Sequence, residues 1–299
     1  MPRQPDSGCL KRPDGVSHRG LREQTSTTVL RRRIPVAPHK TPRQSSGPGR
    51  DRTLRGPILA RDRNGFDPST YDQRLLEMGR ADHDWKHADP WRVMRITSEF
   101  IAGFDALHDL DWAVTVFGSA RLGEGTPEYE QARQLGAALV EAGYAVITGG
   151  GPGLMEGPNR GAHEVGGTSV GLGIELPFEQ GLNEWVDLGL NFRYFFARKT
   201  MFLKYSQAFI SLPGGYGTMD EVFEILCMVQ TGKVTNFPIV LLGTEYWGGL
   251  VDWIREQLLG RGLISDGDDQ LFLVTDSVDE AVEYIVQAHS TMTDPRNIQ

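Results

Sequence analysis

The stretch AFISLPGGYGTMDE, residues 208–221, decides the fold because it joins an apolar strand to a helix through a glycine-rich turn. Its first five residues form a short apolar run that is typical of a buried parallel strand. After Glu221, apolar residues recur at helical spacing from Val222 to Val229. The sequence therefore predicts a strand, a tight loop and a helix in direct succession.

The three glycines of this loop, Gly214, Gly215 and Gly217, predict an anion-binding turn. Glycine permits positive φ and lets a ligand approach the backbone closely. The N–H groups at the start of the following helix have no partners within the helix, and together with the helix dipole they attract anions. We therefore expect a phosphate at this loop, with Glu221 beside it one turn into the helix.

A second stretch, YAVITGGGPGLME at residues 144–156, has the same construction. Residues 144–148 indicate a strand, residues 149–153 a tight loop, and Leu154, Met155 and Glu156 the start of a helix. In an open parallel sheet such loops lie on one edge, where the carboxyl ends of the strands meet and ligands bind. We expect the two glycine loops to face one ligand.

Strands alternate with helices over residues 112–290, which predicts an α/β fold with a doubly wound parallel sheet. Thr126 is placed to cap a helix that begins at Pro127. Further helices are expected to begin near Arg198, Gly249 and Val278. The expected strands are 112–117, 144–148, 169–174, 191–196, 208–212, 238–242 and 271–274.

The chain outside this domain divides into three parts. Residues 1–63 hold 15 Lys and Arg against 5 Asp and Glu and show no sustained periodicity, which predicts a disordered basic tail. A solvated tail is favoured there over a nucleic-acid contact. Residues 64–111 predict a helical extension, whose longer helix runs from Pro90 to about residue 108. Residues 291–299 form a C-terminal tail.

The composition disfavours several classes of protein. Residues 64–299 hold 16 Lys and Arg against 34 Asp and Glu, and this acidic balance disfavours nucleic-acid binding by the folded part. The two cysteines, Cys9 and Cys227, imply neither a disulfide framework nor a metal cluster, so we expect a cytoplasmic protein. No apolar run approaches the roughly 20 residues of a membrane span, and we expect no membrane association.

The glycine loops do not match the common nucleotide fingerprints. The motif GxxxxGK[ST] is absent, and GxGxxG with an acidic residue about 20 positions on is not met after the first strand. Both observations disfavour NTP hydrolysis and hydride transfer. Ser119 and Ser211 lack a recognisable base partner, which disfavours serine hydrolase chemistry.

The charged residues beside the loops have structural explanations as well as functional ones. Arg198 and Lys199 at a helix start oppose the helix dipole, so they indicate a bound anion or a carboxylate partner. A surface pair with Asp220 or Glu224 would also account for them. Acidic residues in a first helical turn, such as Glu156, are common because the dipole favours them, although such a carboxylate can also hold a ribose hydroxyl or water.

Taken together, these motifs resemble the Lonely Guy (LOG) family, whose members are often mislabelled as lysine decarboxylases. The resemblance covers residues 114–285 and implies a Rossmann-like fold. It also implies a cofactor-independent phosphoribohydrolase, which cuts the N-glycosidic bond of nucleoside 5′-monophosphates and releases a free base and ribose 5-phosphate. The best-known substrates of the family are cytokinin ribotides, which are N6-substituted forms of AMP. The resemblance rests on VFGS (116–119), GGGPGLME (149–156), Arg198-Lys199 with Met201, and PGGYGT (213–218) with Glu221.

Carried over by position, the resemblance assigns the catalytic pair to Arg198 and Glu221. It implies that Glu221 stabilises positive charge at the anomeric carbon or positions water, and that Arg198 holds the phosphate or assists the departing base. No metal site is expected, and the family implies a homodimer or higher homo-oligomer. The implied nucleotide and phosphate contacts are Gly118, Ser119, Gly150, Gly151, Met155, Glu156, Lys199, Gly214, Gly215, Tyr216, Gly217 and Thr218.

Two alternatives from other functional classes stay open at this point. The same fold could serve as a non-catalytic carrier of a nucleotide or of molybdenum cofactor. Binding of single-stranded DNA is the second alternative, which the acidic body weakens. The chain departs from the family at Asp220, where Glu is frequent, and in its long N-terminal extension, which bears on oligomeric state and substrate preference.

Overall fold

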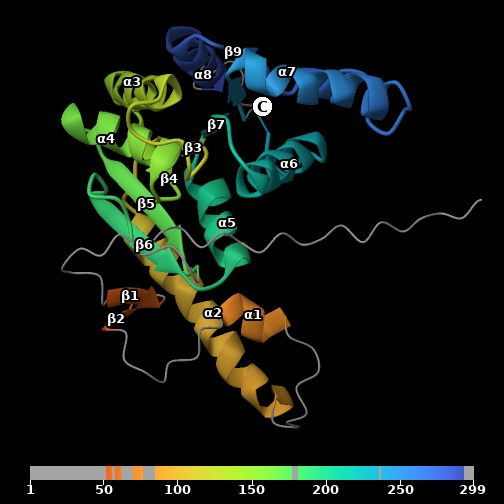
Figure 1. Cartoon of the computed structure of the whole chain (residues 1–299). Coiled ribbons are helices and arrows are strands. Elements are labelled where there is room, and N and C mark those ends of the chain that lie inside the picture. The colour runs from red at the N-terminus through yellow and green to blue at the C-terminus, as the bar shows by residue number, and fades with distance from the viewer. Residues whose placement is uncertain are drawn as a thin grey trace, which may run out of the picture. The chain divides into compact units, whose positions relative to one another are not determined.

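The computed structural model describes residues 52–55, 58–61, 70–76, 85–176, 181–235 and 237–292. Its centre is a seven-stranded sheet in which every pair of neighbouring strands is parallel (Figure 1), as the sequence predicts. The strand order is β6-β5-β4-β3-β7-β8-β9. The strands are β3 (Ala113–Phe117), β4 (Ala145–Thr148), β5 (Ser169–Ile174), β6 (Leu188–Phe192), β7 (Ala208–Ser211), β8 (Ile239–Leu242) and β9 (Leu273–Thr275).

The strand order reverses between β3 and β7. The first strand of the sheet along the chain is β3. The chain then adds β4, β5 and β6 on one side of it, and crosses to add β7, β8 and β9 on the other side. Such a reversal opens a crevice at the carboxyl ends of the two central strands, which is the usual ligand site of doubly wound sheets. The loops after β3 and β7 therefore flank the position where a ligand is expected.

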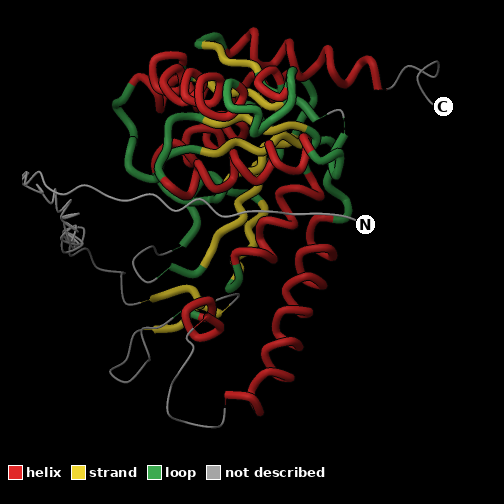
Figure 2. The backbone as a smooth tube through the Cα atoms, turned by 90° about the vertical axis from the view of Figure 1, so that its right-hand side faces the viewer, coloured by secondary structure: helices red, strands yellow, loops and turns green. Residues whose placement is uncertain are grey.

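Helices cover both faces of the sheet and enclose two apolar clusters (Figures 1 and 2). Alternate residues of β3 point to opposite faces, so Val114 and Val116 belong to one cluster and Ala113 and Phe117 to the other. The first cluster includes residues of α3 (Pro127–Glu141), α4 (Glu156–Glu164) and α8 (Val278–Met292). The second includes residues of α2 (Trp85–Leu107), α5 (Phe195–Tyr205), α6 (Tyr216–Gln230) and α7 (Thr244–Trp253).

Short helical segments complete the described part of the domain. A 3₁₀ turn, η1 (Gly153–Met155), precedes α4, and a π-helical segment, η2 (Ile254–Leu259), continues α7. A second 3₁₀ turn, η3 (Asp268–Gln270), precedes β9. Thr126 caps α3 as expected, because its hydroxyl accepts a hydrogen bond from the Tyr129 N–H at 3.3 Å.

The N-terminal extension contains α1 (Tyr71–Leu76) and the long helix α2, which packs on α5. Ile96 and Phe100 of α2 rest against the second apolar cluster. Before it, β1 (Arg52–Arg55) and β2 (Ile58–Arg61) form an antiparallel hairpin, so these residues have regular structure where the composition predicts none. The rest of residues 1–63 and residues 293–299 lie outside the described residues.

Three helices begin earlier than the sequence predicts. Helix α5 begins at Phe195 instead of near Arg198, and β6 ends at Phe192, because the aromatic run that looked like strand is the first turn of the helix. Helix α7 begins at Thr244 instead of near Gly249. Helix α2 likewise begins at Trp85, ahead of the predicted start at Pro90.

Candidate active site

The loops after β3, β4 and β7 are joined through the backbone of Ser119. Its N–H donates to the Pro213 carbonyl at 3.0 Å, and its carbonyl accepts from the Leu154 N–H at 2.8 Å. A Cβ at Gly118 would lie 2.7 Å from the Leu154 Cβ, so glycine is needed there to let η1 pack against the end of β3. The two glycine loops and the Gly118–Ser119 turn therefore meet at the predicted edge of the sheet.

The glycines of the two loops serve different purposes. Gly150 has φ of +67°, which side chains rarely adopt. Gly214, Gly215 and Gly217 all lack positive φ, so the expectation for this loop was wrong on that point. Close approach explains Gly214 instead, because a Cβ there would lie 2.0 Å from the Thr218 hydroxyl oxygen. A Cβ at Gly215 or Gly217 would meet nothing within 4 Å. The start of α6 thus presents bare backbone to open space.

Arg198 and Glu221 form an ion pair between α5 and α6. The Arg198 Nη2 lies 3.6 Å from the Glu221 Oε1, and the two side chains are 13% and 7% exposed. The guanidinium carbon of Arg198 lies 5.0 Å from the ring centroid of Phe195 and 5.5 Å from that of Phe202. The predicted pair is therefore assembled, largely buried and supported by aromatic rings.

Burial sets the protonation of Glu221. Loss of water around the carboxyl raises its pKa to about 7, and the nearby charges of Arg198 and Lys199 oppose that rise only in part. A carboxyl with a pKa near neutrality can exchange a proton with substrate or water at physiological pH. The geometry thus gives Glu221 the property that a general base or acid needs.

The first glycine loop lies next to the pair. A Cβ at Gly149 would stand 3.9 Å from the Arg198 Nη1, and 2.7 Å from the Met155 sulfur. The Met155 methyl carbon would stand 2.7 Å from a Cβ at Gly151. Met155 therefore covers this loop. The predicted site residues Gly151, Met155, Arg198 and Glu221 lie close together here.

Lys199 differs from Arg198 in its carboxylate partners. Its Nζ lies 2.8 Å from a carboxylate oxygen of Asp220 and 2.8 Å from one of Glu224. Burial alone would lower the pKa of this ammonium, but the carboxylates outweigh burial and raise it. The carboxylate pairing weighed from the sequence thus holds for Lys199, which braces α5 against α6 on either side of Glu221.

Two other predicted site residues have different surroundings. The Glu156 carboxylate accepts a hydrogen bond from the Tyr129 hydroxyl at 2.8 Å, which ties α4 to α3. Burial, followed by the effect of Glu156, raises the pKa of Tyr129 to about 12, against an opposing effect of Arg160. Tyr216, the first residue of α6, is 96% exposed.

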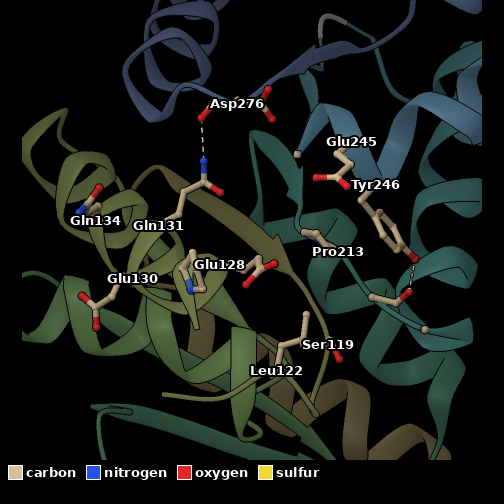
Figure 3. A pocket seen from close by; sticks show the side chains of 14 residues that line it. Ser119, Leu122, Glu128, Glu130, Gln131, Gln134, Pro213, Glu245, Tyr246 and Asp276 are labelled. Atoms are coloured by element: carbon tan, nitrogen blue, oxygen red, sulfur yellow. Dashed lines mark hydrogen bonds between the residues drawn. The ribbon is translucent and has the colours of Figure 1, made fainter. Parts of the chain in front are cut away.

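Tyr246 is a site residue that the sequence analysis missed. Its hydroxyl donates a hydrogen bond to the Gly214 carbonyl (Figure 3), and the neighbouring Trp247 donates from Nε1 to the Ser211 carbonyl at 3.1 Å. Helix α7 therefore holds both the end of β7 and the glycine loop that follows it. No local motif marks Tyr246, because the contact joins a helix that follows β8 to the loop that follows β7.

A cavity of about 1170 Å³ opens at the strand reversal. Figure 3 shows Glu128 and Gln131 of α3 on one side of it and Glu245 and Tyr246 of α7 on the other. Ser119 and the loop from Pro213 to Gly215 also line it, whereas Arg198 and Glu221 do not. A second cavity, of about 880 Å³, lies where α1 meets α5 and α6, beside the pair. The pair thus lies outside both cavities, close to residues that line each of them.

Neither a cluster of metal-binding side chains nor a membrane-spanning helix is found in the part of the chain that the structure describes. No three His, Cys, Asp or Glu residues of that part are arranged to hold a metal ion. None of its helices combines the length and the apolar character needed to cross a bilayer.

Comparison with known proteins gives consistent results. A family model described as "Possible lysine decarboxylase" matches residues 155–285. The chain is 32% identical over 179 residues to the cytokinin riboside 5′-monophosphate phosphoribohydrolase of Rhodococcoides fascians, covering 58% of this chain and 88% of that protein. It is 30% identical over 179 residues to a probable enzyme of the same name from Oryza sativa subsp. japonica, covering 58% of this chain and 76% of the relative.

A solved structure of similar outline is the molybdenum cofactor carrier protein of Chlamydomonas reinhardtii. It is 24% identical, with a TM-score of 0.45, and the match covers 60% of this chain and 99% of that one. The sequence relatives decide the assignment, because they are at least 30% identical and most of their length is matched. The chain belongs to the Lonely Guy family, the family of the cytokinin riboside 5′-monophosphate phosphoribohydrolases.

Proposed function

We propose that this protein hydrolyses the N-glycosidic bond of AMP or of N6-substituted AMP, and releases the free base and ribose 5-phosphate. The observation that carries the proposal is the ion pair of Arg198 and Glu221, 3.6 Å apart and buried where two glycine loops meet. The names of the sequence relatives support the same activity.

The reaction adds water across the bond between the anomeric carbon and the base nitrogen. The bonding electron pair leaves with the base, and the sugar passes through an oxocarbenium-like state. The Glu221 carboxylate stabilises this positive charge and accepts one proton from the attacking water, whose oxygen bonds to the anomeric carbon. The departing base nitrogen takes up a proton, so the two products together gain one molecule of water. A pKa of about 7 keeps a large fraction of Glu221 ionised at neutral pH.

The bare backbone at the start of α6 is the proposed phosphate site. Gly215, Gly217 and Thr218 bring N–H groups of the first helical turn to one place, and open space lies before the two glycines. Gly118 and Ser119 close the site from the β3 side. Arg198 then acts either on the phosphate or on the departing base, since positive charge next to the anomeric carbon itself would oppose the reaction.

The test is a chromatographic assay of the purified protein. We expect AMP and N6-isopentenyl-AMP to yield equimolar free base and ribose 5-phosphate, and adenosine to react far more slowly because it lacks the phosphate. A Glu221→Ala variant should retain its fold and lose turnover. Release of no free base from any nucleoside monophosphate would refute the proposal, and tight nucleotide or molybdenum cofactor binding without product would point to the carrier alternative.

We also propose that the protein acts as a homodimer or larger homo-oligomer in the cytoplasm. Large apolar side chains stand exposed along α2, where Trp91, Met94 and Ile101 are 64%, 62% and 64% exposed. A second copy of the chain would remove them from water, which favours association. Light scattering coupled to size exclusion measures the mass directly, and a monomer at micromolar concentration would contradict this part of the proposal.

A further inference from the structure

We infer that the base of the substrate occupies the 880 Å³ cavity beside the ion pair, and that α1 of the N-terminal extension forms one of its walls. This inference rests on the proposed function and adds to it a specificity site built from residues outside the glycine motifs. Its volume falls within the range of small-molecule sites. The cavity is lined by Thr70, Asp72, Gln73, Leu75, Leu76, Glu175, Leu176, Phe195, Phe196, Lys199, Asp220 and Glu224.

The position of this cavity relative to the phosphate loop suits a nucleotide. Gly215 at the start of α6 lines the larger cavity, whereas Asp220 and Glu224, farther along the same helix, line the smaller one. Glu221 directly follows Asp220 on this helix, about 9 Å from Gly215 at 1.5 Å per residue. A phosphate at the start of α6 and a base beside Asp220 therefore place the sugar near Glu221.

Phe195 connects the cavity with the ion pair. Its ring lines the cavity, and its centroid lies 5.0 Å from the guanidinium carbon of Arg198. Lys199, the residue after Arg198, also lines the cavity. A base in the cavity is thus next to the cation that the proposed reaction assigns to the phosphate or to the leaving group.

Helix α1 is fastened to the rest of the site, so its wall of the cavity is preformed. The Asp72 carboxylate accepts a hydrogen bond from the Phe195 N–H at 3.1 Å. The Tyr71 ring packs edge-on against Tyr194 with centroids 6.2 Å apart, and the Arg193 guanidinium lies 5.1 Å from the Tyr71 centroid. These contacts bind α1 to the segment that leads into α5.

The lining chemistry selects a neutral aromatic ring with an apolar substituent. Leu75, Leu76, Leu176, Phe195 and Phe196 supply apolar and aromatic surface, on which a purine ring and an alkyl group can pack. Four carboxylates line the cavity against one ammonium, which disfavours a phosphate and suits the N–H donors of an adenine-type base. The predicted occupant is adenine carrying an apolar N6 substituent.

The test compares Leu76→Gln with Leu263→Gln. Leu76 and Leu263 are 75% and 62% exposed, so neither change should unfold the protein, and only Leu76 lines the cavity. We expect Leu76→Gln to lower the ratio of kcat/KM for N6-isopentenyl-AMP to that for AMP by about fivefold, in line with losing part of one apolar contact. Leu263→Gln should leave that ratio unchanged.

Calorimetric binding of free N6-isopentenyladenine separates the two proposals. Weaker binding in Leu76→Gln than in Leu263→Gln, in a protein that turns over no nucleotide, would support the base pocket and remove the proposed function. Normal turnover in Leu76→Gln, with the substrate ratio and the base affinity both within twofold of wild type, would overturn the base pocket and leave the proposed function intact. A wild-type protein that neither binds the base nor cleaves the nucleotide would reject both.

Discussion

The guanidinium of Arg198 and the carboxylate of Glu221 lie 3.6 Å apart, which is too far for a hydrogen bond and close enough for strong Coulombic attraction. The two groups come from successive helices on one face of the sheet, and both are largely buried. Burial raises the pKa of Glu221 to about 7 while Arg198 counters it. The charge of Glu221 in this pair therefore changes with pH in the physiological range.

Replacing Glu221 with Gln should reduce kcat by about 10²–10⁴-fold if Glu221 is the base that activates water. The amide has nearly the same shape, so the fold is retained, but it cannot take a proton or carry negative charge. Single-turnover kinetics with AMP measures the chemical step directly. Wild-type turnover in this variant would remove Glu221 from the mechanism.

The same substitution should change the dependence of stability on pH. The pKa of Glu221 is raised from 4.5 to about 7 on folding, so the folded state binds more protons between those values, and stability falls as pH rises through them. The loss is at most about 3 kcal/mol for this group. Urea unfolding at pH 4.5 and pH 8 should therefore show a larger loss in wild type than in Glu221→Gln. Equal losses in both proteins would argue against a raised pKa.

The pH profile of kcat/KM should rise with an apparent pKa near 7, because the proposed mechanism needs the Glu221 carboxylate. The charge of Arg198 lowers the pKa of Glu221, so Arg198→Gln should move this rise to higher pH. Lys199→Gln should move it in the same direction by less, since its effect on Glu221 is the smaller one. A profile that falls through pH 7 would mean that Glu221 acts as an acid instead.

Tyr246→Phe should weaken the phosphate site. The hydroxyl of Tyr246 fixes the Gly214 carbonyl, and its loss should raise KM for AMP a few-fold and cost about 1 kcal/mol of stability. Tyr205→Phe is a matched control, because the Tyr205 hydroxyl also donates to a backbone carbonyl, that of Phe104. We expect Tyr205→Phe to lower stability without changing KM. Identical KM values in the two variants would show that Tyr246 has no part in the site.

Local patterns predicted the parallel sheet, and the family resemblance predicted the pair of Arg198 and Glu221, which lie 3.6 Å apart. The local patterns misplaced the starts of α5 and α7 because carboxylates from distant parts of the chain satisfy those helix ends. Asp72 binds the Phe195 N–H, and Asp276 binds the N–H of Thr244 at 2.7 Å. A pattern read within one segment does not contain such contacts, and Tyr246 was missed for the same reason.

Gly161→Ala should destabilise the protein by about 1–3 kcal/mol through overpacking. A Cβ at Gly161 in α4 would lie 1.9 Å from the Arg133 carbonyl oxygen of α3, so the two helices could not keep their close approach. Gly248→Ala in α7 is the control, because a Cβ there meets nothing within 4 Å. That change should stabilise the helix by about 0.5–1 kcal/mol. Thermal unfolding of the two variants should shift in opposite directions.

Glu99→Ala should destabilise the start of α5 and, as a result, the position of Arg198. Glu99 of α2 is 5% exposed, and its carboxylate accepts hydrogen bonds from the N–H groups of Arg193 and Tyr194 at 2.9 and 3.3 Å. It also pairs with the Arg193 guanidinium at 3.2 Å. Removing one partner of a buried ion pair costs about 3–5 kcal/mol, because the other charge stays buried without compensation.

The control for Glu99→Ala is Glu124→Ala, which breaks a pair with Arg160 at 2.9 Å in which Glu124 is 69% exposed. An exposed pair contributes about 0–1 kcal/mol, so this variant should be close to wild type in stability and in turnover. Because Glu99 holds the backbone that leads into α5, Glu99→Ala should lower kcat even at temperatures where it remains folded. Equal stability losses in the two variants, or full turnover in folded Glu99→Ala, would show that the N-terminal extension does not position the catalytic helix.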